Sequence, residues 1–215
     1  MVPAPKGAMA ILMMGVLLRG PLLFAGFNGR TAKEGIANPS ECERWLGAEI
    51  WAVLNAPDTV QAFALRHWPR GSAAARTRER TVSLPPGTPP DILGYPVYAA
   101  SKENSVEIAR GLSALILRKE TYAPKGMPFS RRFIKGCAPQ PDAAFRLSAG
   151  GRAVVVLIDF SCDQVGIATA VGGAPSGRVA IGDIDPSRGA FLSLVKRALP
   201  GVPEIAAIPE IRRRD

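Results

Sequence analysis

Two cysteines, Cys137 and Cys162, enclose the part of this 215-residue chain whose residue types could do chemistry. Between them lie a short apolar run, the dipeptide Gly150-Gly151 and a longer apolar run, a pattern that predicts a β-hairpin. Folding the hairpin about the two glycines puts Cys162 opposite Pro139, so a diagonal neighbour or a one-residue bulge brings the sulfurs within bonding distance. Cys137 and Cys162 are therefore the disulfide candidate, and closing this loop would stabilise the fold by about 3.5 kcal/mol.

Two other states of these cysteines stay open, a pair of reduced core thiols and a metal site. A zinc site needs about four Cys, His or acidic ligands, and the chain has three cysteines and one histidine. A redox pair needs a close Cys-x-x-Cys motif, which the sequence lacks. The third cysteine, Cys42, fits a small buried hydrophobic residue. The sequence thus indicates no metal and no cofactor.

The other ionisable candidates form no recognisable catalytic motif. His67, the single histidine, lies on a predicted strand and would have to serve a Ser-His-Asp or Cys-His site alone. Asp183 and Asp185 flank a predicted helix start, where capping explains them. Asp159 interrupts an apolar strand, and a buried carboxylate there needs a partner, for which Arg146 across the hairpin is our candidate.

Residues 172–179 have the glycine spacing of a phosphate-binding loop. That chemistry needs a lysine where Arg178 stands and a serine or threonine where Val179 stands, and we predict no helix immediately after it. We therefore interpret the segment as a connecting loop.

The elements that must position these residues are predicted from hydrophobic periodicity. Helices are predicted over residues 41–54, 102–122 and 185–199, and strands over residues 59–68, 94–99, 143–148, 153–160 and 164–171, with a further short strand at 178–181. The strand 153–160 is apolar on both faces, which is typical of a central strand covered on both sides. We therefore expect an α+β fold with one domain over residues 38–208, in which a mostly antiparallel sheet of about five strands is packed by two or three helices.

The two ends and one internal segment have a different composition. Residues 70–90 form a loop rich in proline and arginine, and residues 209–215 a basic tail. Residues 1–29 resemble a signal segment, because Lys6 precedes an apolar run that Arg19 interrupts. We expect export to the periplasm or the exterior, or anchoring in the inner membrane. A start codon further along the chain and a buried N-terminal helix are the alternatives.

The net charge of +9 could attract nucleic acid to the protein. Basic residues cluster at residues 66–80, 131–135 and 212–214, but aromatic residues do not alternate with them repeatedly, as a stacking platform would need. Solvated loops and a solvated tail are the simpler interpretation.

From Asp58 onward the chain resembles a set of uncharacterised bacterial proteins that often carry signal or lipoprotein-like leaders. The matching segments are PDTVQAFAL from Pro57, GYPV from Gly94, and CAPQPDAAFR from Cys137, which leads into the apolar strand that ends near Cys162. Relatives often show two cysteines near the end of that strand, whereas this chain has one. The resemblance implies the fold and export only, because the set has no established activity.

Three functions stay open. The first is a non-enzymatic, exported or membrane-anchored envelope domain that binds a protein or another envelope component. The second is an intracellular basic protein that binds nucleic acid. The third is an enzyme whose site would bring His67, Asp159 or Asp163 and a cysteine together.

Overall fold

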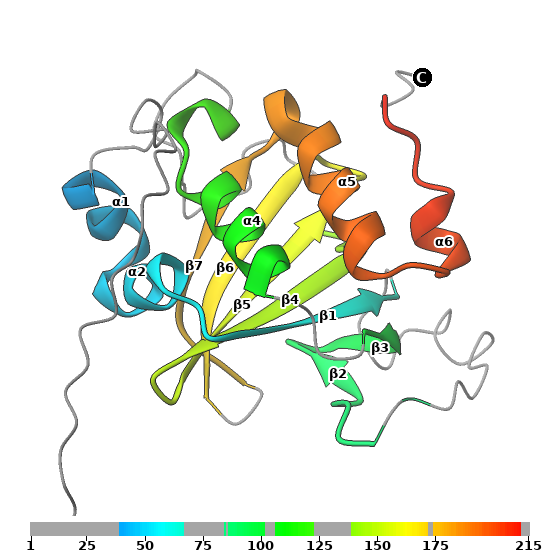
Figure 1. Ribbon diagram of the computed structural model, residues 1–215, viewed down its shortest axis with the longest axis horizontal. Coiled ribbons are helices and arrows are strands. Elements are labelled where there is room, and N and C mark those ends of the chain that lie inside the picture. The colour runs from blue at the N-terminus through cyan, green and yellow to red at the C-terminus, as the bar shows by residue number, and fades with distance from the viewer. Residues whose placement is uncertain are drawn as a thin grey trace, which may run out of the picture. The chain divides into compact units, whose positions relative to one another are not determined.

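Seven strands form one antiparallel sheet in the computed structural model, which describes residues 39–66, 84, 86–101, 106–122, 139–171 and 174–211 (Figure 1). In their order across the sheet the strands are β2 (Asp91–Ile92), β3 (Tyr95–Ala100), β1 (Thr59–Leu65), β4 (Ala143–Ala149), β5 (Arg152–Asp159), β6 (Gln164–Val171) and β7 (Ala174–Asp183). All of the described residues belong to one compact unit, Lys33–Asp215. The predicted leader, residues 1–29, lies outside the described residues.

Helices cover one face of this sheet. They are α1 (Pro39–Leu46), α2 (Ala48–Asn55), α4 (Val106–Ile116), α5 (Arg188–Ala198) and α6 (Pro203–Ala206), with 3-10 turns η1 (Lys119–Thr121) and η2 (Asp185–Ser187). Figure 1 shows α4 and α5 side by side over the strands, and α2 packs on β4 and β5. Among the described helices none has the length and hydrophobicity needed to cross a membrane. The predicted α+β class is confirmed.

The sheet has more strands than predicted, for two reasons. The strand β2 has two residues, too few for an alternating pattern to appear in the sequence. The strand β7 covers ten residues, Ala174–Asp183, where the sequence predicted a connecting loop followed by a strand at 178–181. Its first half is rich in proline, serine and glycine, which favour loops, but pairing with β6 outweighs that preference.

A glycine divides the predicted helix over residues 41–54 into α1 and α2. Gly47 has a φ of 84°, a left-handed conformation that glycine adopts without steric cost. The hydrogen-bonded chain still continues through it, because the Gly47 N–H donates to the Glu43 carbonyl (2.7 Å) and the Gly47 carbonyl accepts from Trp51 (3.0 Å). The apolar stripe alone therefore could not reveal the break.

The helix predicted over residues 102–122 ends earlier, at Ile116 of α4. The hydroxyls of Thr121 and Tyr122 fold back and donate to the carbonyls of Leu115 and Ile116, each at 2.6 Å. These side chains satisfy carbonyls that a continuing helix would have used. Residues 102–105 lie outside the described residues.

The hairpin between β4 and β5 has the predicted register. Ala143 pairs with Ile158 and Ala149 with Arg152. The two turn residues, Gly150 and Gly151, both have positive φ, 54° and 78°, as a two-residue hairpin turn requires.

The central strand β5 is apolar on both faces, as predicted. Val154, Val156 and Ile158 face the helices and belong to the main core, together with residues such as Phe145 of β4. Val155 faces the other way and joins a smaller cluster on the opposite face of the sheet, which contains Phe63, Leu65, Ile92, Val97 and Ala144. The side of the sheet without α4 and α5 is thus apolar as well.

Candidate functional site

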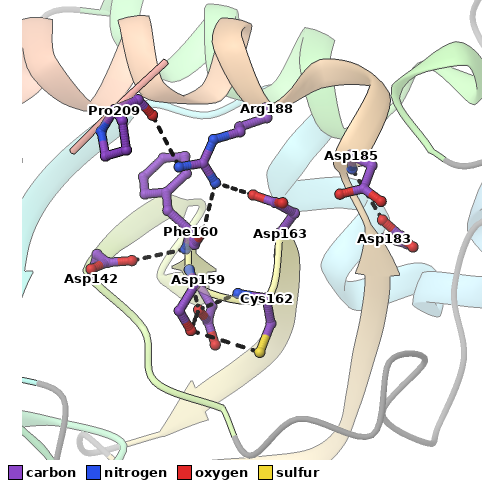
Figure 2. A network of polar contacts seen from close by, with 10 residues as sticks. Asp142, Asp159, Phe160, Cys162, Asp163, Asp183, Asp185, Arg188 and Pro209 are labelled. Carbon is purple, nitrogen blue, oxygen red and sulfur yellow. Dashed lines mark hydrogen bonds and ion pairs between the residues drawn. The ribbon is translucent and has the colours of Figure 1, made fainter. Parts of the chain in front are cut away.

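Asp159 ends β5 and organises the turn that follows it (Figure 2). Its Oδ1 atom accepts hydrogen bonds from the backbone N–H groups of Ser161 (2.8 Å) and Cys162 (3.1 Å), and from the Ser161 hydroxyl (2.6 Å). Its Oδ2 atom accepts from the backbone N–H of Gln140 at 2.7 Å. Four donors therefore stabilise this carboxylate, which is only 5% exposed.

The expectation that Arg146 would pair with Asp159 is wrong. Arg146 lies opposite Val155 in the hairpin and is exposed. Asp159 is four residues further along β5, which corresponds to about 13 Å along a strand. Backbone N–H groups and the Ser161 hydroxyl stabilise the buried carboxylate, for which the sequence predicted a cation as partner.

The cysteine of this turn, Cys162, is buried, and its sulfur lies 3.7 Å from the Ser161 hydroxyl. This sulfur is a disulfide sulfur and carries no titratable proton. The side chains of the other two cysteines, Cys42 and Cys137, lie outside the described residues. The pairing of Cys137 with Cys162 therefore stays a prediction.

Arg188, the first residue of α5, joins three segments of the chain through one guanidinium group (Figure 2). It forms an ion pair with the carboxylate of Asp163 and donates hydrogen bonds to the carbonyls of Phe160 (2.6 Å) and Pro209 (3.0 Å). It also lies 5.3 Å from the centre of the Phe160 ring, within the range of a cation–π contact. Because Arg188 is only 7% exposed and Asp163 1% exposed, this is a buried structural pair.

Of the two aspartates predicted to cap the last helix, Asp183 makes such a contact. The Oδ1 atom of Asp183 accepts from the backbone N–H of Asp185 at 3.0 Å, at the start of η2 (Figure 2). Burial raises the pKa of Asp163 above its ordinary value, the hydrogen bond from Arg188 opposes this shift, and Asp185 nearby adds to it.

The sites weighed from the sequence do not assemble in the described part of the chain. His67 lies outside the described residues. No group of three or more His, Cys, Asp or Glu residues suited to a metal ion occurs among the residues that the structure describes. Within residues 172–179, Ala174 begins β7, so a strand follows where a phosphate-binding loop would lead into a helix.

A cavity of about 270 Å³ lies on the side of the sheet that faces away from the main core. Leu157 of β5, Gly166 of β6, and Val179 and Ile181 of β7 line it, and the β2–β3 turn and the segment before β4 close it. Those last two contribute Leu93, Tyr95, Pro139 and Pro141. Most of the exposed lining is apolar. A second hollow of about 360 Å³, beside Thr59, Gln61 and Arg146, is mainly polar.

Two polar side chains reach the edge of the apolar cavity. Asp159 is already saturated by the turn, whereas the Nε2 atom of Gln164 is buried without a hydrogen-bond partner. Gln164 is 4% exposed. The Tyr95 hydroxyl lies 3.4 Å from the Pro139 carbonyl, and burial, with the negative charge of Asp159, raises the pKa of Tyr95. We call this cavity, with Gln164 at its edge, the Gln164 pocket.

Sequence reasoning did not single out Arg188 or Gln164. A cation in the first turn of a helix opposes the helix dipole, and this was the available signal for Arg188. A glutamine at the start of a strand carries no comparable signal, because its role depends on what β5 and β7 place beside it.

Comparisons of the chain with protein-family models, with curated proteins and with solved structures found no match.

Proposed function

We propose that this protein is a non-enzymatic domain of the bacterial envelope, exported or anchored by its leader, that binds a protein or another envelope component through the Gln164 pocket. The observation that carries the proposal is the pocket itself: an apolar cavity with a buried amide donor that no group in the described part of the chain uses. Ligand sites are commonly apolar with a few well-placed polar groups.

The use of the acidic residues supports a binding role over a catalytic one. The Asp159 carboxylate is held by three donors in its own turn and by the backbone N–H of Gln140, and Asp163 is paired with Arg188. A general acid or base must have an atom free to reach a substrate proton. Each of these aspartates instead holds the fold around the β5–β6 turn.

Export is supported by the composition of residues 1–29 and by the disulfide state of Cys162. Disulfides persist in oxidising compartments and are rare in the cytosol. We assign the Cys137–Cys162 pair to this role, as a clamp across the open end of the β4–β5 hairpin.

The test is fractionation of cells that make the full chain and a variant without residues 1–29. The full chain should separate with the periplasm, the medium or the membrane, and the shortened chain should stay in the cytosol. A full chain found only in the cytosol would refute the proposal.

Thiol counting under denaturing conditions tests the clamp independently. The exported protein should show one free thiol without reductant and three after reduction, because the chain has three cysteines. Three free thiols without reductant would contradict the bond, and a Cys42→Ser variant should lower the free count to none.

A further inference from the structure

We infer that the Gln164 pocket receives one apolar side chain of an extended polypeptide, together with a neutral backbone carbonyl that accepts a hydrogen bond from the Gln164 side-chain amide. This inference rests on the proposed binding function and names the ligand of that site.

The donor is the first part of the argument. A buried N–H group without a partner is unfavourable, because it has lost its hydrogen bonds to water. The Nε2 atom of Gln164 is in this position, and Gln164 is one of the residues that line the cavity. A ligand atom that completes this group must be a hydrogen-bond acceptor.

The charge around the donor selects a neutral acceptor. Gln164 stands in the sheet between two aspartates, with Asp159 opposite it on β5 and Asp183 opposite it on β7. The guanidinium group of Arg188 is turned to Asp163 and to backbone carbonyls. A carboxylate or phosphate at Gln164 would therefore meet like charge, whereas an amide carbonyl would not.

The size of the cavity sets the apolar part of the ligand. Pockets for drug-sized molecules measure about 300–1,000 Å³, and this one measures about 270 Å³. A single leucine, methionine or phenylalanine side chain is an occupant of suitable size, and the walls of leucine, valine, isoleucine and proline match its chemistry.

Gly166 leaves space in the wall of the pocket. A Cβ atom at this position would lie 3.6 Å from Val179 and 3.8 Å from Leu157, which is ordinary van der Waals contact. The backbone therefore tolerates a side chain here, although glycine weakens a strand interior. A glycine that is not required by packing is consistent with a position that a ligand approaches closely.

The edge of the sheet indicates that the ligand is a polypeptide. Within the described ranges β7 is the last strand of the sheet and pairs with β6 alone, so a further strand could add to its outer edge. Val179 of β7 lines the pocket and is 38% exposed, one of three large hydrophobic side chains exposed in the described chain. A peptide that extends β7 would gain main-chain hydrogen bonds, while the pocket selects one side chain.

NMR titration of the ¹⁵N-labelled full chain tests this assignment. The probes are N-acetyl-leucine amide, its carboxylate analogue N-acetyl-leucine, and the capped pentapeptides Ala-Ala-Leu-Ala-Ala and Ala-Ala-Ala-Ala-Ala. The neutral amide should shift the Gln164 side-chain resonances and the Gly166 N–H saturably, and the carboxylate should bind about tenfold more weakly or not at all. The leucine pentapeptide should bind about tenfold more tightly than the amide and also shift the amides of β7.

Variants locate the site. Gln164→Met, of similar shape but without the donor, should weaken binding of the amide about tenfold, whereas the matched control Gln61→Met on β1 should not change it. Gly166→Leu should abolish binding by filling the cavity. Gly166→Ala, which meets no clash, should weaken it and serves if the leucine variant does not fold.

Absence of saturable shifts with either neutral probe would overturn the inference, as would equal binding of the carboxylate or an unchanged affinity in Gln164→Met. A pentapeptide that binds no better than the amide would overturn the peptide assignment. If these probes do not bind while the full chain still fractionates with the envelope, the ligand assignment is refuted and the proposed location stands. If a chain found only in the cytosol binds the probes, the ligand assignment stands and the proposed location is refuted.

Discussion

Replacing Gln164 with methionine should make the protein more stable, although the change removes the side-chain amide of Gln164 from the pocket. The wild-type Nε2 group is buried and has no hydrogen-bond partner among the residues that the structure describes. Methionine keeps a similar length and volume and fills irregular apolar space well. The backbone of residue 164 keeps its ladder positions opposite Asp159 and Asp183, since these involve main-chain atoms.

The magnitude follows from the cost of an unsatisfied donor, about 1–3 kcal/mol. Volume-conserving changes in a packed interior cost less than about 1.5 kcal/mol, and methionine also buries more apolar surface than glutamine. We therefore expect the free energy of unfolding to rise by about 1–2 kcal/mol.

Urea denaturation, followed by circular dichroism, measures this change. The midpoint should move to a higher urea concentration while the slope stays unchanged, which indicates altered stability and not an altered unfolded state. The matched Gln61→Met variant, at a half-exposed position, should stay within about 0.5 kcal/mol of wild type. A fall in the stability of Gln164→Met by more than about 1 kcal/mol would refute the reasoning, because it would mean that the amide stabilises the free protein.

Four further changes have defined outcomes. Arg188→Met removes the buried cation that forms the ion pair with Asp163, so the free energy of unfolding should fall by about 3–5 kcal/mol in urea denaturation; a loss below about 1 kcal/mol would show that the pair is not buried in solution. Asp159→Ala removes the acceptor of four hydrogen bonds and should cost at least about 3 kcal/mol, whereas Asp159→Asn keeps one acceptor oxygen and should be less harmful; equal losses in the two variants would contradict the acceptor role given to this oxygen. Gly166→Ala should raise stability by about 0.5–1 kcal/mol, since the new methyl group fits and the unfolded chain loses freedom; a fall in the melting temperature would show that the site is tighter than the structure indicates. Burial, together with the negative charge of Glu204, raises the pKa of Tyr98, so the folded state keeps a phenol proton that the unfolded state releases above about pH 10. The free energy of unfolding should therefore fall as the pH rises past that point, and it should fall less steeply in Tyr98→Phe. Equal slopes in the two proteins would exclude Tyr98 as the cause.

The local pattern of the sequence was sufficient to predict the β4–β5 hairpin. Gly150 and Gly151 fix the turn, and alternating apolar residues on both sides then determine the register that pairs Ala143 with Ile158. The same reasoning identified β5 as a strand covered on both faces. These features depend on residues that are near one another in the chain.

Features that depend on distant residues could not be predicted in this way. Gly47 breaks a helix whose apolar stripe runs through the break, and the first half of β7 becomes a strand because β6 supplies its partners. Arg188 meets Asp163 across 25 positions of sequence, and the side-chain amide of Gln164 is buried without a partner although two aspartates stand opposite it in the sheet.

The bonds of Arg188 have a consequence for how the molecule opens. One guanidinium group holds the turn after β5 and the carbonyl of Pro209, and the Lys196 ammonium holds the neighbouring carbonyl of Ile208 at 3.1 Å. The C-terminal segment cannot detach without breaking a hydrogen bond to the same side chain that holds the turn carrying Cys162. The two regions therefore form one cooperative unit for hydrogen exchange, and a protease that trims the chain before Ile208 would loosen the surroundings of that cysteine from the far end of the sequence.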